Sequence, residues 1–182
     1  MASELSVQTI KGPTSGGNAN KILVPSGHTL DASSGGLTPP AGHVVQVVES
    51  ARTVWSNTAT AYFVSTGHSV AITPTSTSNK ILLMGQMNGT YMSTTNAYMQ
   101  IKLYKNSSDI AWLASNYGQN ANGHIGESFS WSYLDSPSTT SATTYELYYR
   151  APYGGTTVGY NNYAINGNNT TRSSIIAMEI SA

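Results

Sequence analysis

Short alternating runs of β-branched, aromatic and polar residues recur every 10–15 positions along this chain, with turn residues between them. The runs "TTYELYYRA" at 143–151 and "SSIIAMEIS" at 173–181 are typical examples. A side-chain period of two indicates half-buried strands, whereas no window shows the 3.6-residue period of an amphipathic helix. The pattern therefore predicts an all-β protein with an antiparallel sandwich.

The predicted strands follow one another regularly after residue 41. They lie at 43–50, 59–64, 67–73, 79–87, 97–105, 109–114, 127–134, 143–151 and 173–181. Some carry bulky side chains on both faces, as where Tyr145, Leu147 and Tyr149 alternate with Tyr148. Because a strand buried on one face alone should be polar on the other, a second surface of these strands is expected to be covered. A contact between subunits is the economical explanation.

Residues 1–40 differ from the rest of the chain. Two short strand-like pieces, "SVQTI" and "NKILVP", are followed by the Gly- and Pro-rich stretch "SGHTLDASSGGLTPP". This part has too few apolar residues to hold its own core, so we expect an anchoring or assembly segment joined by a linker to a domain at 41–182. Its candidate anchor residues are Ile10, Ile22, Val24 and Leu30.

Charge is unusually scarce in this chain. Only 9% of the 182 residues are charged and the formal net charge is zero, against about 25% charged residues in ordinary proteins. No basic field is present to attract nucleic acid or an anionic membrane, and no run approaches the roughly 20 apolar residues of a membrane span. The N-terminus lacks a signal-peptide pattern, so we expect assembly in a cytoplasm. Ser, Thr and Asn make up about a third of the chain, which suits neutral partners such as sugars but is also common in extended β-proteins of virions.

Connections between antiparallel strands alternate between the two ends of a sandwich, and this sorts them into two sets. One set, at 74–78, 106–108 and 135–142, is short to medium in length, rich in Ser, Thr and Pro, and free of aromatic residues. The other set, at 88–96, 115–126 and 152–172, is longer and rich in Tyr, Asn and Gly. Because the last strand runs away from the Tyr-rich end, we expect the anchor at the opposite end.

Tyr combined with Asn, Ser and Gly is the composition of adaptable binding loops, in which Tyr supplies contact area at low entropic cost. Long Gly/Asn loops can also be mere tolerated insertions, and the sequence leaves both interpretations open. On the first interpretation the candidate receptor-binding residues are Tyr91, Asn116, Tyr117, Asn122, His124, Tyr153, Tyr160, Asn161, Asn162 and Tyr163.

The stretch "VPSGHTLDAS" places Ser26, His28 and Asp31 close together and suggests a hydrolase at first sight. A nucleophilic serine needs a tight, buttressed turn, however, and this one follows a proline in a segment without a core. Pro25 and Gly27 predict a turn there instead. The four histidines lack the spacing of a metal site, and no carboxylate pair of the glycosidase type is indicated. The sequence therefore predicts no catalytic residue, no metal site and no cofactor.

Three stretches carry a resemblance to a known family: "HSVAITPTSTSNKILLMGQMNG", "AYMQIKLYKNSSDIAW" and the ending "SSIIAMEISA". They resemble the C-terminal domains of phage tail fibres and related virion proteins, especially those of marine cyanophages. The earlier stretch "ANKILVPSGHTLDASSGG" looks like a segment that precedes such domains. The likeness is one of strands and turns and covers most of the chain.

This resemblance implies a jelly-roll sandwich of the tumour-necrosis-factor and complement type, assembled as a homotrimer on the virion surface. The N-terminal segment would bind other virion proteins, and the distal loops would contact a glycan or protein receptor on the host. The chain has no internal repeat, unlike many long tail fibres, so a capsid-decorating head fibre or a purely structural fibre-junction protein is the alternative. A polysaccharide-degrading enzyme is a third and weaker one.

Overall fold

The computed structural model describes residues 10–17, 19, 21–29, 40–94, 97–118, 128–153, 156–161 and 171–182. Every regular element in these ranges is a β-strand. The described residues contain no helix that could cross a membrane. The chain forms two compact units, Met1–Thr38 and Pro39–Ala182.

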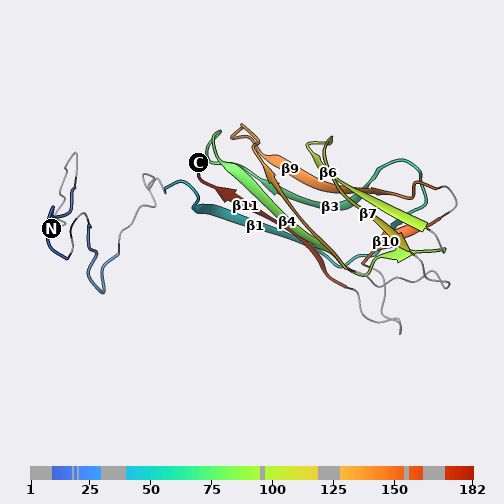
Figure 1. Cartoon of the computed structure of the whole chain (residues 1–182), viewed down its shortest axis with the longest axis horizontal. Helices are drawn as coiled ribbons and strands as arrows, with labels where there is room; N and C mark the ends of the chain where they lie inside the picture. Colours follow the sequence, from blue (N-terminus) through green and yellow to red (C-terminus); the bar gives the residue numbers. More distant parts are fainter. Residues whose placement is uncertain are drawn as a thin grey trace, which may run out of the picture. The chain divides into compact units, whose positions relative to one another are not determined.

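Two four-stranded antiparallel sheets build the larger unit (Figure 1). In the first sheet the order is β1 (Val44–Arg52), β11 (Ser173–Ile180), β4 (Lys80–Met87) and β8 (Phe129–Asp135). In the second sheet it is β3 (Val64–Ile72), β9 (Thr143–Arg150), β6 (Ala97–Lys105) and β7 (Ser108–Gly118). Counted among the eight long strands alone, these orders read 1-8-3-6 and 2-7-4-5. This is the strand order of a jelly roll, so the predicted fold class is confirmed.

A third, smaller sheet joins three of the connections. Its order is β2 (Ser56–Thr58), β10 (Val158–Tyr160) and β5 (Tyr91–Met92). We call it the distal sheet, because its strands come from the connections between β1 and β3, β9 and β11, and β4 and β6, which share one end of the sandwich. The sequence had predicted loops throughout 88–96 and 152–172, so that prediction is wrong for β5 and β10.

One of the predicted strands is not present in the structure. The sequence predicted strands at 59–64 and 67–73, but 59–63 is a connection, and β3 takes up only residue 64 of the first prediction before it continues through 65–72. The register of β3 against β9 shifts between Ser65 and Ser69, and Gly67 between them has a φ of +68°. This irregularity bends β3 where the sequence suggested that a strand ends.

The core lies between the two long sheets, and its side chains come from every second residue of the strands. In β9 and β11, and in β6 up to Tyr104, buried residues alternate with partly exposed ones. The core includes Ile81, Leu83, Met99, Ile101, Leu103, Tyr145, Leu147, Ile175 and Ala177. At Gly85 the absence of a side chain makes room for Trp131, since a Cβ atom there would lie 2.4 Å from the indole ring.

Both chain ends of the domain lie at one end of the sandwich, which we call the base (Figure 1). Val44 pairs with Ile180, so β1 begins where β11 finishes. The Ser181 amide donates to the His43 carbonyl at 2.9 Å, and the Gly42 amide donates to the Ser181 carbonyl at 2.8 Å. The β6–β7 hairpin also turns at the base, through Asn106 and Ser107, which both have positive φ as a type I′ turn requires.

The smaller unit contains no strand in its described parts, 10–17, 19 and 21–29. The strand predicted from "NKILVP" is therefore not present at 21–25, while "SVQTI" lies largely outside the described residues. The predicted turn is confirmed: the His28 amide donates to the Pro25 carbonyl at 3.1 Å, and Gly27 has a φ of +84°. Of the anchor candidates, Ile10, Ile22 and Val24 are exposed, and Leu30 is outside the described residues.

Candidate functional site

The end of the sandwich opposite the base, which we call the distal end, contains the predicted receptor-binding residues that the structure describes. Tyr91, Asn116, Tyr117, Tyr153, Tyr160 and Asn161 are in the described ranges, whereas Asn122, His124, Asn162 and Tyr163 are not. Of these, Tyr160 and Asn161 are buried, Tyr91 is half-buried and Tyr153 is exposed, while Asn116 and Tyr117 are described by their backbone alone.

Tyr160 is fully buried, because β10 is a strand of the distal sheet and turns this side chain inward. Its ring lies edge-on to Tyr149, 6.2 Å between centroids, and parallel to the His68 ring at 6.3 Å. Its hydroxyl donates to the Thr66 carbonyl at 3.3 Å, and burial raises the pKa of Tyr160 to about 12. The prediction that Tyr160 contacts a receptor is therefore wrong.

Asn161 is buried as well, and its hydrogen bonds link β10 to neighbouring segments of the chain. Its side-chain amide donates to the carbonyls of Arg52 at 3.0 Å and Val54 at 3.2 Å, beyond the end of β1. Its own amide donates to the Asn88 carbonyl at 2.9 Å, and the Ser173 hydroxyl donates to its side-chain oxygen. Its φ of +56° is one that Asn tolerates better than most residues. Its side chain and its backbone N–H are used internally and it is buried, so the prediction of a receptor contact is wrong here too.

Tyr153 remains a surface candidate, with 62% of its area exposed. Its ring meets Tyr98 edge-on at 5.4 Å between centroids, and Tyr98 pairs with Tyr117 across the β6–β7 ladder. The distal parts of β6 and β7, and the connection that follows β9, therefore bring the backbone positions of three tyrosines to one region. Sequence reasoning missed Tyr98, although its alternation with inward-facing Met99 and Ile101 was a signal that it faces outward.

A second aromatic pair belongs to the distal sheet. The ring of Trp55 meets that of Tyr91 edge-on at 5.6 Å. The same Trp55 ring covers Gly159, where a Cβ atom would lie 2.6 Å from the indole and 2.5 Å from the Ser56 carbonyl oxygen. Trp55 was not among the predicted residues, because only the pairing of β2 with β10 places it there.

Glu179 is a fully buried carboxylate near the base, on the inner face of the first sheet. It accepts hydrogen bonds from the Gln46 side chain at 2.6 Å, the Thr75 amide at 2.6 Å and the Asn79 side chain at 2.7 Å. Burial alone would raise the pKa of Glu179, but these donors together lower it below the ordinary value. Glu179 is therefore ionised and fastens the β3–β4 connection to β11.

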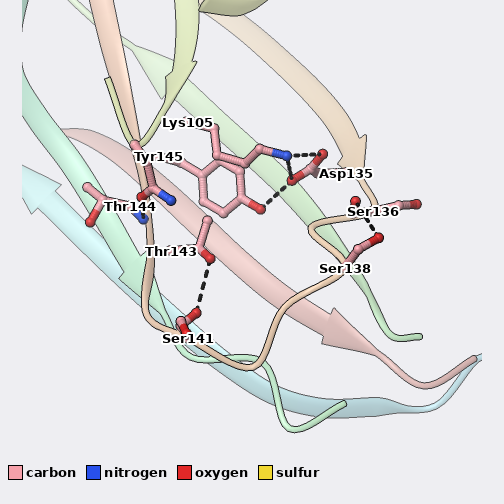
Figure 2. Close-up of polar contacts among 9 residues, drawn as sticks. Lys105, Asp135, Ser136, Ser138, Ser141, Thr143, Thr144 and Tyr145 are labelled. Atoms are coloured by element: carbon pink, nitrogen blue, oxygen red, sulfur yellow. Dashed lines mark hydrogen bonds and ion pairs between the residues drawn. The ribbon is translucent and has the colours of Figure 1, made fainter. Parts of the chain in front are cut away.

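Asp135 is the second buried acid near the base (Figure 2). The Lys105 ammonium lies 3.0 and 3.1 Å from its two oxygens, and the Tyr145 hydroxyl donates to it at 2.6 Å. Burial, followed by this bond, raises the pKa of Tyr145 far above its ordinary value, so the phenol stays protonated. These contacts tie the first sheet, through β8, to β6 and β9 of the second.

These two acids do not form a hydrolytic site. A glycosidase needs one carboxyl group with a raised pKa and a cleft that holds the sugar between the pair. Both carboxylates here are instead engaged by internal donors. The described residues also contain no group of three or more His, Cys, Asp or Glu side chains that could hold a metal ion.

The outer face of the first sheet carries a line of apolar side chains, one from each strand, which we call the apolar row. Val47 pairs with Met178, Met178 with Leu82, and Leu82 with Leu134. Val47 and Leu134, at the two edges of the sheet, are each more than half exposed. The neighbouring pair Ile176–Met84 extends the same surface. A sheet face that meets only water is normally polar, so this face is unusual.

Comparison with known proteins adds little to this description. No family model matches the chain, and no curated protein matches it. Among solved structures, the chain is similar to the one titled "Crystal structure of infectious bursal disease virus VP2 subviral particle", with 14% identity and a TM-score of 0.44. The alignment covers 93% of this chain and 40% of that one. The jelly-roll assignment accordingly rests on the strand order of the chain itself.

Proposed function

We propose that this chain is a non-enzymatic structural protein of a bacteriophage virion, a tail fibre or short appendage, that binds a host-surface receptor with its distal end. The observation that carries this proposal is that the two ends of the domain differ: one holds both chain ends and the other holds an exposed aromatic residue. Pro40–His43 and Ser181 are fastened together at the base, while the exposed Tyr153 and its half-buried partner Tyr98 lie at the opposite end. The sequence resemblance to phage fibre domains supplies the biological setting.

The receptor in this proposal is a glycan. Tyrosine rings offer an apolar face for a sugar ring and a hydroxyl for its polar edge, and they lose little entropy on binding. Tyr91 and Tyr153 are the candidates whose side chains the structure describes, and the backbone of β7 places Asn116 and Tyr117 at the same end. Asn122, His124, Asn162 and Tyr163 remain candidates from the sequence.

Assembly as a homotrimer is part of the same proposal, and the apolar row is the surface that we assign to it. Interfaces of permanent oligomers are richer in apolar side chains than ordinary protein surface. The chain is otherwise rich in hydroxyl and amide groups, and the apolar row provides such a surface through Val47, Leu82, Leu134 and Met178. The exposed Ile10, Ile22 and Val24 of the smaller unit would bind another virion protein.

Adsorption to host cells tests the receptor proposal. The full chain with Tyr98 and Tyr153 both replaced by Ser should lose most of its binding to the cells that the virus infects. Tyr104→Ser is the matched control, because it removes a half-exposed tyrosine from the base half of the second sheet. Unchanged adsorption of the double variant, with its fold intact by circular dichroism, would refute a distal receptor site made by these tyrosines.

A purely structural protein, either a head fibre that decorates the capsid or a fibre junction, is the second candidate. This candidate is favoured because Tyr160 and Asn161, two of the predicted contact residues, are buried and take part in internal packing. Deletion of residues 1–38 separates the two functions, since Pro39–Ala182 is a compact unit with its own core. If the protein is a receptor-binding protein, the shortened chain still binds cells. If it is purely structural, the shortened chain is no longer incorporated into virions and shows no cell binding.

A further inference from the structure

The outer face of the second sheet holds an aromatic cluster that the proposed function does not use. Trp112, on the edge strand β7, is 50% exposed. Phe63, from the connection that leads into β3, meets it edge-on at 5.7 Å between ring centroids. Because β3 and β7 are opposite edges of the sheet, this connection reaches over the outer face to bring the two rings together.

Two cations accompany these rings. The Lys102 ammonium lies 4.9 Å from the centre of the Phe63 ring and 5.0 Å from that of Trp112, and the Arg150 guanidinium lies 4.7 and 5.9 Å from the same two centres. Contacts of this kind orient a cation and hold the ring in place. The contacts with Lys102 and Arg150 therefore hold the two rings in place, although half of the Trp112 surface stays open to water.

Both cations are already matched by polar partners. Lys102 forms an ion pair with Asp109, and the Arg150 Nε atom donates to the Gln100 side-chain oxygen at 2.7 Å. The Arg150 Nη1 atom also donates to the Ala61 carbonyl at 3.2 Å. Asp109 neutralises Lys102, whereas the partners of Arg150 are neutral acceptors, so an acidic sugar is the alternative ligand that the test has to separate.

We propose that this cluster is a binding site for a neutral pyranose, with Trp112 as the stacking platform. A sugar ring has an apolar C–H face, which packs on an aromatic ring, and a rim of hydroxyl groups, which need both donors and acceptors. Lys102 lies over the rings, and Asp109 and Gln100 are the polar partners of the two cations, so ammonium, carboxylate and amide groups accompany the cluster. The site uses other residues than the distal Tyr98–Tyr153 pair, although Gln100 and Lys102 follow Tyr98 on the same outer face of β6.

The two outer faces of the domain differ in a way that favours a sugar here over a protein partner. Protein interfaces are depleted of charged residues at their centre, and the apolar row on the first sheet has that character. The Trp112 cluster has two cations at its centre and an acid beside them, and desolvating them under another protein surface is costly. Nucleic acid would need several unpaired cations along a groove, and among the described members of the cluster only Arg150 lacks an anionic partner.

Titration by nuclear magnetic resonance tests the site on the full chain. Trp55, Trp112 and Trp131 each give one indole N–H signal, and Trp112→Phe identifies the signal of Trp112. Maltohexaose, cellohexaose and mannohexaose are the neutral probes, and a hyaluronan hexasaccharide is the acidic one. We expect at least one neutral probe to shift the Trp112 signal in a saturable way and leave that of the core residue Trp131 in place.

Variants then separate stacking from folding. Trp112→Ala should weaken binding of the responding sugar at least about tenfold, while Trp112→Phe retains part of it. Glu49→Gln, on the other sheet, should bind the sugar as the wild type does. The Tyr98/Tyr153 double variant should also keep this binding, which makes failure of the distal receptor proposal distinguishable from failure of this one.

Three outcomes would overturn the proposal. One is the absence of any Trp112 shift with all neutral probes, and another is a response to the acidic probe alone. The third is a lower solution mass for Trp112→Ala than for the wild type, which would make the cluster an interface between copies of the chain.

Discussion

Glu179 and Asp135 occupy the two positions that flank Ile81 on the inner face of the first sheet, one on each neighbouring strand. Two buried acids thus stand near the base of a jelly roll whose interior is otherwise mostly apolar. Each has its own set of donors, one drawn from the β3–β4 connection and β1, the other from the second sheet. Ionised side chains therefore contribute to stability at this end of the domain.

Glu179→Gln should lower the free energy of unfolding at pH 7 by about 1–3 kcal/mol, because it leaves buried donors without their acceptor. The pKa of Glu179 is lowered in the folded state, so its contribution is present above the unfolded pKa and is lost as pH falls through the folded one. The variant should lose less stability than the wild type below about pH 4.5. Urea denaturation at pH 7 and pH 4 measures this. Glu49→Gln, an exposed member of an ion pair, is the control and should change stability by less than about 1 kcal/mol.

Tyr145→Phe removes one donor from Asp135 and leaves the Lys105 ion pair in place. We expect a loss of about 1–2 kcal/mol in unfolding free energy, because the carboxylate is buried and keeps a vacant acceptor position. Tyr104→Phe, which alters a half-exposed tyrosine of the neighbouring strand, should cost much less. Equal costs for the two variants in chemical denaturation would contradict the cross-sheet tie.

His68 should titrate below the ordinary histidine range. Burial lowers the pKa of His68, a hydrogen bond to the Ser50 carbonyl partly offsets this, and Arg52 lowers it further. Because the folded pKa is depressed, protonation opposes folding, and stability falls as pH drops below about 6.5. Side-chain nuclear magnetic resonance gives the pKa directly, and His68→Gln should flatten the stability curve between pH 7 and pH 5.5. A His68 pKa at or above 6.5 would contradict this prediction.

Gly85→Ala should destabilise the domain by about 1–3 kcal/mol, because the added methyl group overlaps the Trp131 ring and the core is already full. Gly17→Ala is the matched control, since a Cβ atom there meets nothing within 4 Å. Thermal unfolding followed by Trp fluorescence compares the two. A Gly85→Ala protein as stable as the wild type would show that the ring can move aside.

Replacing Leu82 and Leu134 together with Ser should convert the proposed trimer into monomers, because both side chains belong to the apolar row. Light scattering at micromolar concentration measures the mass of wild type and variant. Trp112→Ser, which alters the outer face of the other sheet, should leave the mass unchanged. A monomeric wild type would remove the argument that this row is a subunit contact of the isolated protein.

The sequence predicted most reliably what depends on local alternation. Met99, Ile101 and Leu103 alternate with polar or aromatic neighbours, and the predicted strand 97–105 coincides with β6. The sequence also predicted the connection that contains the Asn106–Ser107 turn, because turn residues interrupt the alternation there.

Tyr153 and Tyr160 show where the sequence was insufficient. Both stand in one Gly- and Asn-rich stretch, and composition gave them the same role. Tyr160 is buried because β10 pairs with β2 and β5, which are distant in the sequence, while Tyr153 has no such partner strand. Pairing between distant short segments leaves no periodic signal in either of them. The meeting of Phe63 with Trp112 is hidden for the same reason, since it follows from the order of strands in the second sheet.

The bonds between Ser181 and the chain at Gly42–His43 have a consequence for engineering and for evolution. A domain whose entry and exit points adjoin needs only two neighbouring attachment points on whatever carries it. Such a unit can be inserted into a surface turn of an unrelated protein, or permuted with a short linker, without opening its sheets. Its far end would then face outward in each new setting, which makes the fold a transferable module whose outward surface can diversify independently of its mounting.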